Sequence, residues 1–97
     1  MWILRSAGNT LGGPYLFRMI SERVRTLGRG PNADFIIDAP LISRLHCRLT
    51  AVDSELVVED LGSTNGISVN DHRVQRSTLQ DGDRFRIGRV ELIIDTV

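Results

Sequence analysis

The stretch DRFRIGRVELIID, from Asp83 to Asp95, decides the fold class because polar and apolar residues alternate on both sides of one short turn. Before the turn, Phe85 and Ile87 alternate with two arginines. After it, apolar residues again occupy every second position: Val90, Leu92 and Ile94. A period of two places the apolar side chains of a strand on one face. The stretch therefore predicts a β-hairpin that turns at Gly88-Arg89.

The same alternation continues toward the N-terminus in shorter segments. In YLFRMI the residues on one face are Tyr15, Phe17 and Met19, and in HCRLTAV they are Cys47, Leu49 and Ala51. Four further runs have strand length: WILR at 2–5, FIID at 35–38, ELVVED at 55–60 and ISV at 67–69. Between the runs lie stretches rich in Gly, Pro, Asn or Asp, which favour turns: SAGNTLGGP, GRGPN, DAP, DLGSTNG and LQDGD. Many short strands separated by such turns predict an all-β, antiparallel sandwich.

Residues 20–28 fit two interpretations. Ile20, Val24 and Leu27 have helical spacing, between a possible cap at Ser21 and a possible stop at Gly28. The β-branched residues of this segment and its all-β surroundings instead favour a strand over VRTLG, at 24–28.

Length and charge limit the number of domains and argue against nucleic-acid binding. The chain has 97 residues, enough for one core, so residues 1–97 are expected to form a single domain. With 12 basic and 12 acidic residues the formal net charge is zero, and no overall positive field favours nucleic acid. Every basic residue is Arg, which fits bidentate anion recognition and fits codon bias equally well.

A single cysteine and the N-terminal sequence indicate the compartment. Cys47 has no partner for an internal disulfide, which favours a reducing environment. The opening MWILRSAGN lacks the features of a signal peptide, and no run approaches the ~20 apolar residues that span a bilayer. The sequence therefore predicts a soluble, cytoplasmic protein that does not bind membranes.

Three polar islands interrupt the strand pattern: Gly28-Arg29, then Ser43-Arg44-x-His46, then Ser63-Thr64-Asn65-Gly66 followed by Asn70. Each lies at or beside the end of an expected strand. Loops of a sandwich cluster at its two ends, so islands distant in sequence can meet at one edge. Together they would offer guanidinium, hydroxyl, amide and backbone N–H donors, a set suited to a small oxyanion such as phosphate.

The motifs GR, SRxH and STNG with a following Asn, in this order and separation, resemble the signature of the forkhead-associated (FHA) domain. The resemblance runs from about Trp2 to the end of the chain. It implies a sandwich of about eleven strands that reads phosphothreonine in partner proteins for Ser/Thr kinase signalling, without a cofactor. It also implies that residues 38–42 and 70–73 read the third residue after the phosphothreonine.

The resemblance assigns roles to individual residues. The implied phosphate-binding residues are Arg29, Ser43, Arg44 and Thr64. Asn65 is expected to hold the backbone of the bound peptide. The implied loop scaffold consists of Gly28, His46, Gly66 and Asn70.

A catalytic interpretation finds little support in the pattern. Ser43, His46 and Asp60 are the residue types of a hydrolytic triad, and Cys47 is a conceivable thiol nucleophile. Adjacent strand residues point to opposite faces, however, which separates Cys47 from His46. The chain has no GxSxG motif and no His/Cys spacing typical of a metal site. We therefore expect no enzyme activity and no bound metal.

An alternative function is a structural or homotypic interaction sandwich in which the phosphate pocket is vestigial. Ile93 and Val57, opposite in phase to core-facing neighbours, are expected to be exposed and could belong to its binding surface. Under the phosphothreonine interpretation the protein is expected to be a monomer.

Overall fold

The computed structural model describes residues 1–8 and 14–97. All elements assigned within these residues are strands: β1 (Trp2–Ser6), β2 (Leu16–Met19), β3 (Arg23–Gly28), β4 (Phe35–Ile36), β5 (Cys47–Val52), β6 (Glu55–Asp60), β7 (Ile67–Val69), β8 (His72–Val74), β9 (Arg76–Leu79), β10 (Arg84–Ile87) and β11 (Val90–Thr96). The part of the chain that the structure describes contains no helix long and apolar enough to cross a membrane.

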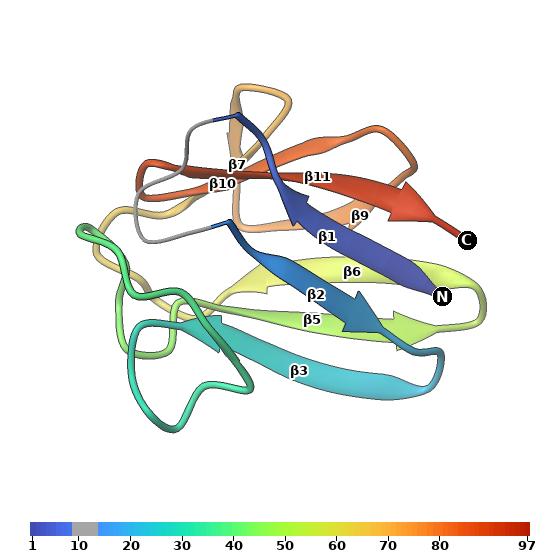
Figure 1. Ribbon diagram of the computed structural model, residues 1–97, viewed down its shortest axis with the longest axis horizontal. Coiled ribbons are helices and arrows are strands. Elements are labelled where there is room, and N and C mark those ends of the chain that lie inside the picture. The colour runs from blue at the N-terminus through green and yellow to red at the C-terminus, as the bar shows by residue number, and fades with distance from the viewer. Residues whose placement is uncertain (9–13) are drawn as a thin grey trace.

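The strands form two sheets that pack face to face (Figure 1). Sheet A has the order β2-β1-β11-β10-β7-β8, and sheet B has the order β4-β3-β5-β6-β9. The predicted all-β sandwich is confirmed. Its strictly antiparallel pairing is wrong at one pair, because β4 runs parallel to β3. The chain loops back after β3, so that the Ile37 N–H donates to the Gly28 carbonyl at 2.9 Å.

The core fills the space between the sheets. Its fully buried side chains include Leu4, Phe85, Leu92 and Ile94 from sheet A and Leu27, Leu49, Leu56 and Val58 from sheet B. Along one side, the edge strands β2 and β4 are joined by stacked rings. The Phe17 ring lies 4.7 Å from that of Phe35 and 5.9 Å from that of Tyr15. Tyr15 and Phe17 pack against the core and Met19 is fully buried, which confirms that these three residues share the inward face.

Residues 20–28 form a turn and then β3, so the strand interpretation is confirmed and the helix is wrong. Glu22 has a φ of 61°, and its N–H donates to the Ala51 carbonyl at 2.7 Å, which fixes the chain beside β5. The hairpin at Gly88-Arg89 is confirmed by the pairing of Ile87 with Val90.

Other boundaries differ from the prediction. The run FIID contributes only Phe35–Ile36 as strand, and β8 and β9 were not predicted. Of the predicted turn SAGNTLGGP, positions 9–13 lie outside the described residues.

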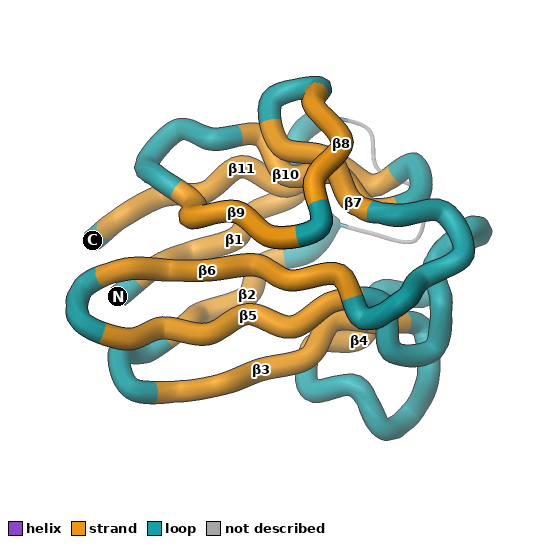
Figure 2. Tube along the Cα trace, turned by 180° about the vertical axis from the view of Figure 1, so that it is seen from behind, coloured by secondary structure: helices purple, strands orange, loops and turns teal. Residues whose placement is uncertain are grey.

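The loops that contain the polar islands lie together at one end of the sandwich (Figure 2). Both chain termini lie at the opposite end, where the Val97 N–H donates to the Met1 carbonyl at 2.9 Å (Figures 1 and 2). The candidate site is therefore built on the ends of strands whose other residues form the core.

Candidate functional site

Backbone hydrogen bonds join the first two polar islands. The Arg29 N–H donates to the Ser43 carbonyl at 2.9 Å, and the Gly30 N–H donates to the Arg44 carbonyl at 3.1 Å. These bonds continue the line of β3 beyond its last residue. They hold the backbone of Arg29 against that of Ser43, so both side chains emerge at the same end of the sandwich.

A third hydrogen bond brings in the STNG loop. The Thr64 N–H donates to the Ser43 hydroxyl oxygen at 3.2 Å, although the two residues are 21 positions apart. Accepting this bond leaves the Ser43 hydroxyl hydrogen available as a donor. The Thr64 side chain is exposed beside it. The Ser43 hydroxyl and the Thr64 backbone, from different loops, therefore lie next to each other.

His46 lies beneath these loops and is completely buried. Its Nδ1 accepts the Ser43 N–H at 3.0 Å, and its Nε2 lies 2.7 Å from the Gly66 carbonyl oxygen. Because a carbonyl can only accept, Nε2 carries the hydrogen and the ring is in the Nε2–H tautomer. One buried imidazole thus ties the Ser43 loop to the STNG loop.

The catalytic arrangements considered from the sequence do not form. Both ring nitrogens of His46 are engaged by backbone groups, so neither faces the Ser43 hydroxyl as a base. The Asp60 carboxylate bonds to Ser63 instead of to the imidazole. Cys47 is fully buried, and burial raises the pKa of its thiol far above the ordinary range. These contacts describe loop scaffolding and core packing.

Asp60 and Ser63 form a contact network that the sequence interpretation missed. The Ser63 hydroxyl donates to the Asp60 carboxylate and accepts the Gly66 N–H at 2.9 Å. The Ser63 N–H also donates to Asp60 at 3.3 Å. An acidic residue three positions before a serine in a Gly-rich stretch is a local turn signal that would have identified this network.

Two glycines have structural reasons to be glycine. A Cβ on Gly28 would lie 1.9 Å from the Arg44 carbonyl oxygen, so no side chain fits there. Gly66 has a φ of +76°, in the left-handed region that glycine adopts freely. A Cβ on Gly66 would also lie 2.8 Å from the Arg73 guanidinium.

A cavity of about 620 Å³ opens at this end of the sandwich. It is lined by Arg29, Gly30, Pro31, Ile42, Ser43 and Arg44. The Arg29 side chain is 50% exposed and its Nε donates to the Asp38 carboxylate at 3.3 Å. Within residues 1–8 and 14–97, no hydrogen bond or ion pair engages the Arg44 guanidinium. The cavity therefore has two guanidinium groups and a hydroxyl available to an anion.

The two asparagines occupy different places. The Asn65 amide nitrogen donates to the Leu41 carbonyl at 3.0 Å, which links the STNG loop to the loop before Ser43. Asn70 instead bonds to the start of β10, where its amide donates to Asp83 and accepts the Arg84 N–H, both at 3.0 Å. Asn70 has a φ of 49° and shapes the turn between β7 and β8. Its side chain is engaged away from the cavity lining.

Comparison with known proteins identifies the family. The sequence model of the FHA domain matches residues 25–88, about two thirds of the chain and all three polar islands. This chain belongs to the FHA domain family.

Solved FHA domains share the whole fold. The FhaA FHA domain, crystallised in complex with the intracellular domain of Rv3910, is 30% identical, with a TM-score of 0.86 over 97% of this chain and 99% of that one. A second structure, from a study of phosphothreonine-dependent FHA domain interactions, is 29% identical, with a TM-score of 0.88 over 99% of this chain and 96% of that one.

Among curated proteins, the glycogen accumulation regulator GarA of Mycobacterium tuberculosis is 32% identical over 78 residues. The match covers 80% of this chain and 48% of GarA. The FHA domain thus spans about half the length of this relative.

Two further expectations concern the surface and metals. Ile93 and Val57 of this FHA domain are half-buried, so the expectation that they are exposed is wrong. Across the described ranges, no three His, Cys, Asp or Glu residues lie close enough together to hold a metal ion.

Proposed function

We propose that this FHA domain binds phosphothreonine in partner proteins through Arg29, Ser43, Arg44 and Thr64, and so mediates phosphorylation-dependent association in Ser/Thr kinase signalling. The observation that carries the proposal is that two of the islands line one cavity and the third is hydrogen-bonded to a residue of its lining. Arg29, Ser43 and Arg44 line it, and Thr64 is hydrogen-bonded to the Ser43 hydroxyl. The relative studied for phosphothreonine-dependent interactions has the same fold at 29% identity.

The donors match the charge of the ligand. A phosphothreonine carries about −1.5 to −2 charges at pH 7 and three acceptor oxygens. Because the chain has no net charge, the anion must be neutralised locally, by the guanidinium groups of Arg29 and Arg44. The hydroxyls of Ser43 and Thr64 then donate to the remaining oxygens. Ile42 and Pro31, the apolar lining residues, offer contact to the threonine methyl group, worth ~0.8 kcal/mol.

The remaining residues position these donors. His46 sets the backbone at Ser43, while Gly28 and Gly66 permit the close approach and turn that the loops require. Asn65 contacts the backbone of the bound peptide, and Leu41 aligns its amide. Asn70 holds the turn between β7 and β8, which supports the proposed reading of flanking residues by 38–42 and 70–73.

We further propose that the domain is a binding module without catalytic activity or cofactor, and that its partner is a cytoplasmic protein instead of nucleic acid or a membrane. A single copy is proposed to hold the phosphate, since Arg29, Ser43 and Arg44 line one cavity. The zero net charge fits local recognition of one phosphate better than binding along a polyanion.

Calorimetric titration with matched peptides tests the proposal. Three peptides of one sequence, carrying threonine, phosphoserine or phosphothreonine, would be compared, the sequence being chosen from an oriented phosphothreonine peptide library. We expect binding only with phosphate and preferentially to phosphothreonine. Arg76→Ala is the control variant, because Arg76 lies on the outer face of sheet B and lines a different hollow. Equal binding of all three peptides would contradict the proposal and favour the homotypic alternative.

A further inference from the structure

The outer face of sheet B carries an uncovered row of β-branched residues. The strand register places Val24, Thr50, Val57 and Thr78 side by side across β3, β5, β6 and β9. Val52 lies in the next row, and Val24 and Val52 are 50% and 43% exposed. β-branched side chains have few rotamers to lose, so covering such a row costs little conformational entropy. A hollow of about 440 Å³ lies over the same face.

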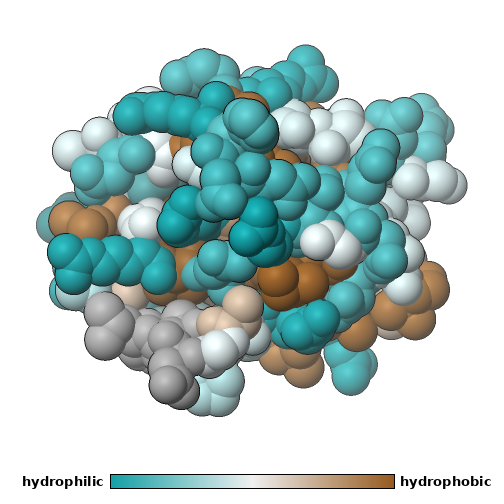
Figure 3. All heavy atoms as spheres, turned by 90° about the horizontal axis from the view of Figure 1, so that it is seen from above, coloured by the Kyte–Doolittle hydropathy of each residue, from teal (hydrophilic) through white to brown (hydrophobic). Residues whose placement is uncertain are grey.

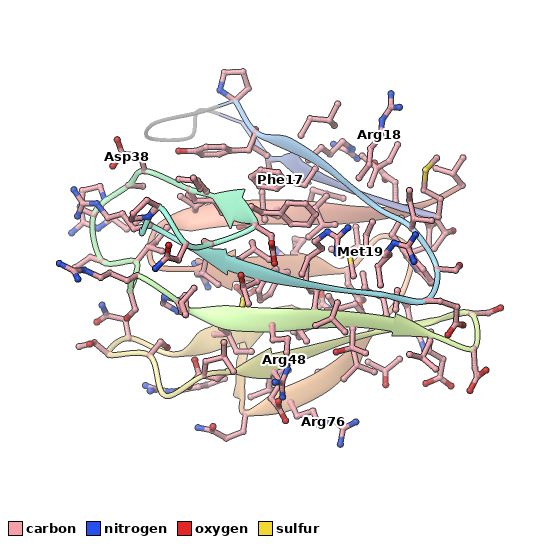
Figure 4. All side chains as sticks on the ribbon, turned by 90° about the horizontal axis from the view of Figure 1, so that it is seen from below. Phe17, Arg18, Met19, Asp38, Arg48 and Arg76 are labelled. Atoms are coloured by element: carbon pink, nitrogen blue, oxygen red, sulfur yellow. The ribbon has the colours of Figure 1, made fainter. Side chains whose placement is uncertain are left out.

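A charged row flanks the β-branched row on the side toward the phosphate site. Arg48, Glu59 and Arg76 are neighbours across β5, β6 and β9, and Arg48 forms an ion pair with Glu59. Figure 4 shows Arg48 and Arg76 pointing away from the sandwich on the same side, while Phe17 and Met19 point between the sheets. On β3, Thr26 completes this row, and the Asp34 carboxylate accepts its N–H at 2.8 Å.

We propose that this face binds a second copy of the chain, with a twofold axis parallel to the strands and midway between β5 and β6. This axis places β5 of one copy over β6 of the other, and β3 of one copy over β9 of the other. Thr50 then faces Val57, and Val24 faces Thr78. The β-branched row packs on itself in the aligned geometry that face-to-face sheets prefer.

The charges select this axis. It places Arg48 of each copy over Glu59 of the other, so the two intrachain ion pairs become a ring of four alternating charges. It also places Arg76 over Thr26 and the attached Asp34. An axis perpendicular to the strands would instead stack Glu59 on Glu55, which like-charge repulsion disfavours. The two Asp53 turns meet only at the rim, where salt screens their charges.

The surface near β7 and β8 differs in composition. Hydrophilic side chains cover most of the surface near β7 and β8 (Figure 3). There Asp71 is bonded to both Arg84 and Arg86, at 3.0 and 2.9 Å. The outer face of sheet B combines an apolar row with matched charges, which is what a self-complementary interface requires.

The size of the face sets the expected strength. Four strands about 4.8 Å apart and six residues at about 3.3 Å give a footprint of about 400 Å² per copy. Stable complexes bury about 800 Å² per partner, so this dimer is weak and forms at high concentration. Both phosphate sites would open at the same end of the dimer. If the proposed phosphothreonine function holds, the dimer would engage two phosphorylated segments at once.

Cysteine cross-linking tests the arrangement. In the double variant Val24→Cys/Thr78→Cys, the new thiols lie on strands three spacings apart, about 14 Å, too far for a disulfide within one chain. Sheets packed face to face lie about 10 Å apart, beyond disulfide reach, so the cross-linker is a bis-maleimide with a span of about 8 Å. We expect it to give covalent dimers at about 0.5 mM protein, a concentration suited to weak interfaces. Each single variant should give no covalent dimer, since Cys47 is buried and unreactive. Covalent dimers of the Val24→Cys single variant would mean that Val24 of one copy faces Val24 of the other, which would overturn the proposed axis. The absence of a cross-link in the double variant would overturn it as well.

Sedimentation velocity tests the energetics on the unmodified chain, from about 10 µM to about 1 mM. We expect dimers at the upper end, at least about tenfold weaker association for Val57→Arg or Arg48→Glu, and restored association for Arg48→Glu/Glu59→Arg. Unfolding temperature and phosphopeptide affinity should match the parent chain in all variants. A chain that binds phosphopeptide but stays monomeric at about 1 mM, or dimers insensitive to Val57→Arg, would overturn this inference alone.

Discussion

The proposed phosphate site has two halves that are built in different ways. In the hydroxyl half, Ser43 and Thr64 are held by hydrogen bonds that end on the buried imidazole of His46. In the guanidinium half, Arg29 is half exposed, with one contact to Asp38, and Arg44 extends over the cavity. The first half is fixed before a ligand arrives, whereas the second consists of long side chains that must be ordered by it.

This difference separates stability from affinity. Changes beneath the hydroxyl half remove buried interactions and should cost folding free energy, since unsatisfied buried groups are expensive. Changes in the guanidinium half remove solvent-exposed groups and should leave folding almost unaffected. Variants in the two halves test whether stability and affinity separate in this way.

The largest effect is expected for Gly28→Ala. The new Cβ would lie 1.9 Å from the Arg44 carbonyl oxygen, which is backbone and cannot rotate away. We expect more than about 4 kcal/mol of lost unfolding free energy, measured by urea denaturation, because β3 and the Ser43 loop must separate. Gly30→Ala is the matched control, since its Cβ would meet the Arg44 Cβ at 3.0 Å, a milder overlap. Equal losses in both variants would contradict the explanation.

His46→Ala should cost about 3 kcal/mol of unfolding free energy, because it leaves a cavity and two unpaired backbone groups, the Ser43 N–H and the Gly66 carbonyl. Phosphopeptide affinity should fall as well, since the two loops lose their common anchor. His72→Ala, at an exposed position, provides the control for denaturation. Full stability of His46→Ala would show that the loops are held by other contacts.

Arg29→Ala should weaken phosphothreonine-peptide binding by about 2 kcal/mol, the lower end for truncating one member of a charge pair, because the side chain is half exposed. Unfolding free energy should remain within about 0.5 kcal/mol of the parent chain. Calorimetry and denaturation on the same preparation measure both. A loss of stability without a loss of affinity would reverse the assignment of the two halves.

Lowering the pH from 7.5 to 5 should weaken phosphopeptide binding about tenfold, because the second phosphate ionisation lies near pH 6. Binding of the dianion lowers the pKa of the bound phosphate. Peptide affinity is therefore highest at a pH above the phosphate pKa of the free peptide, and it falls as the pH drops below that value. The fold should not change over this range. A hydrogen bond from the Thr26 N–H lowers the pKa of Asp34, whose carboxylate therefore stays ionised at pH 5. A flat calorimetric profile would count against dianion recognition.

Asp38→Asn should raise affinity two- to threefold, about 0.5 kcal/mol, the smallest effect expected. Asp38 is 82% exposed, and its carboxylate accepts the hydrogen bond from Arg29 Nε. Without this bond, Nε would be available to the phosphate. The gain should disappear in Arg29→Ala/Asp38→Asn, which forms a double-mutant cycle. Weaker binding of Asp38→Asn would mean that the carboxylate orients Arg29 productively.

Most of the fold was predictable because its strands alternate cleanly. The boundaries of ELVVED and ISV, at 55–60 and 67–69, match β6 and β7. β8 and β9 were missed because HRV and RSTL are short, polar edge strands without an alternating apolar face. The parallel β3–β4 pair depends on the path of the loop between them, which local pattern does not encode.

For the site, the sequence motifs located the residues but not their partners. The convergence of Ser43 and Thr64 follows from loops clustering at one end of a sandwich. The bond from His46 to Gly66 requires a register across 20 positions, and the bond from Asn65 to Leu41 requires one across 24. Such contacts depend on the assembled sheets. The network of Asp60 and Ser63 and the bond from Ser43 to His46 each span three positions and were local enough to be predicted.

The adjacency of the first and last residues has a topological consequence. β1 pairs along its whole length with residues 92–96 of β11, and the Val97 N–H donates to the Met1 carbonyl, so residues 1 and 97 lie side by side. A host protein could therefore carry this domain within a surface loop, with little distortion at the junction. The loops that contain the polar islands would then face outward, away from the attachment point.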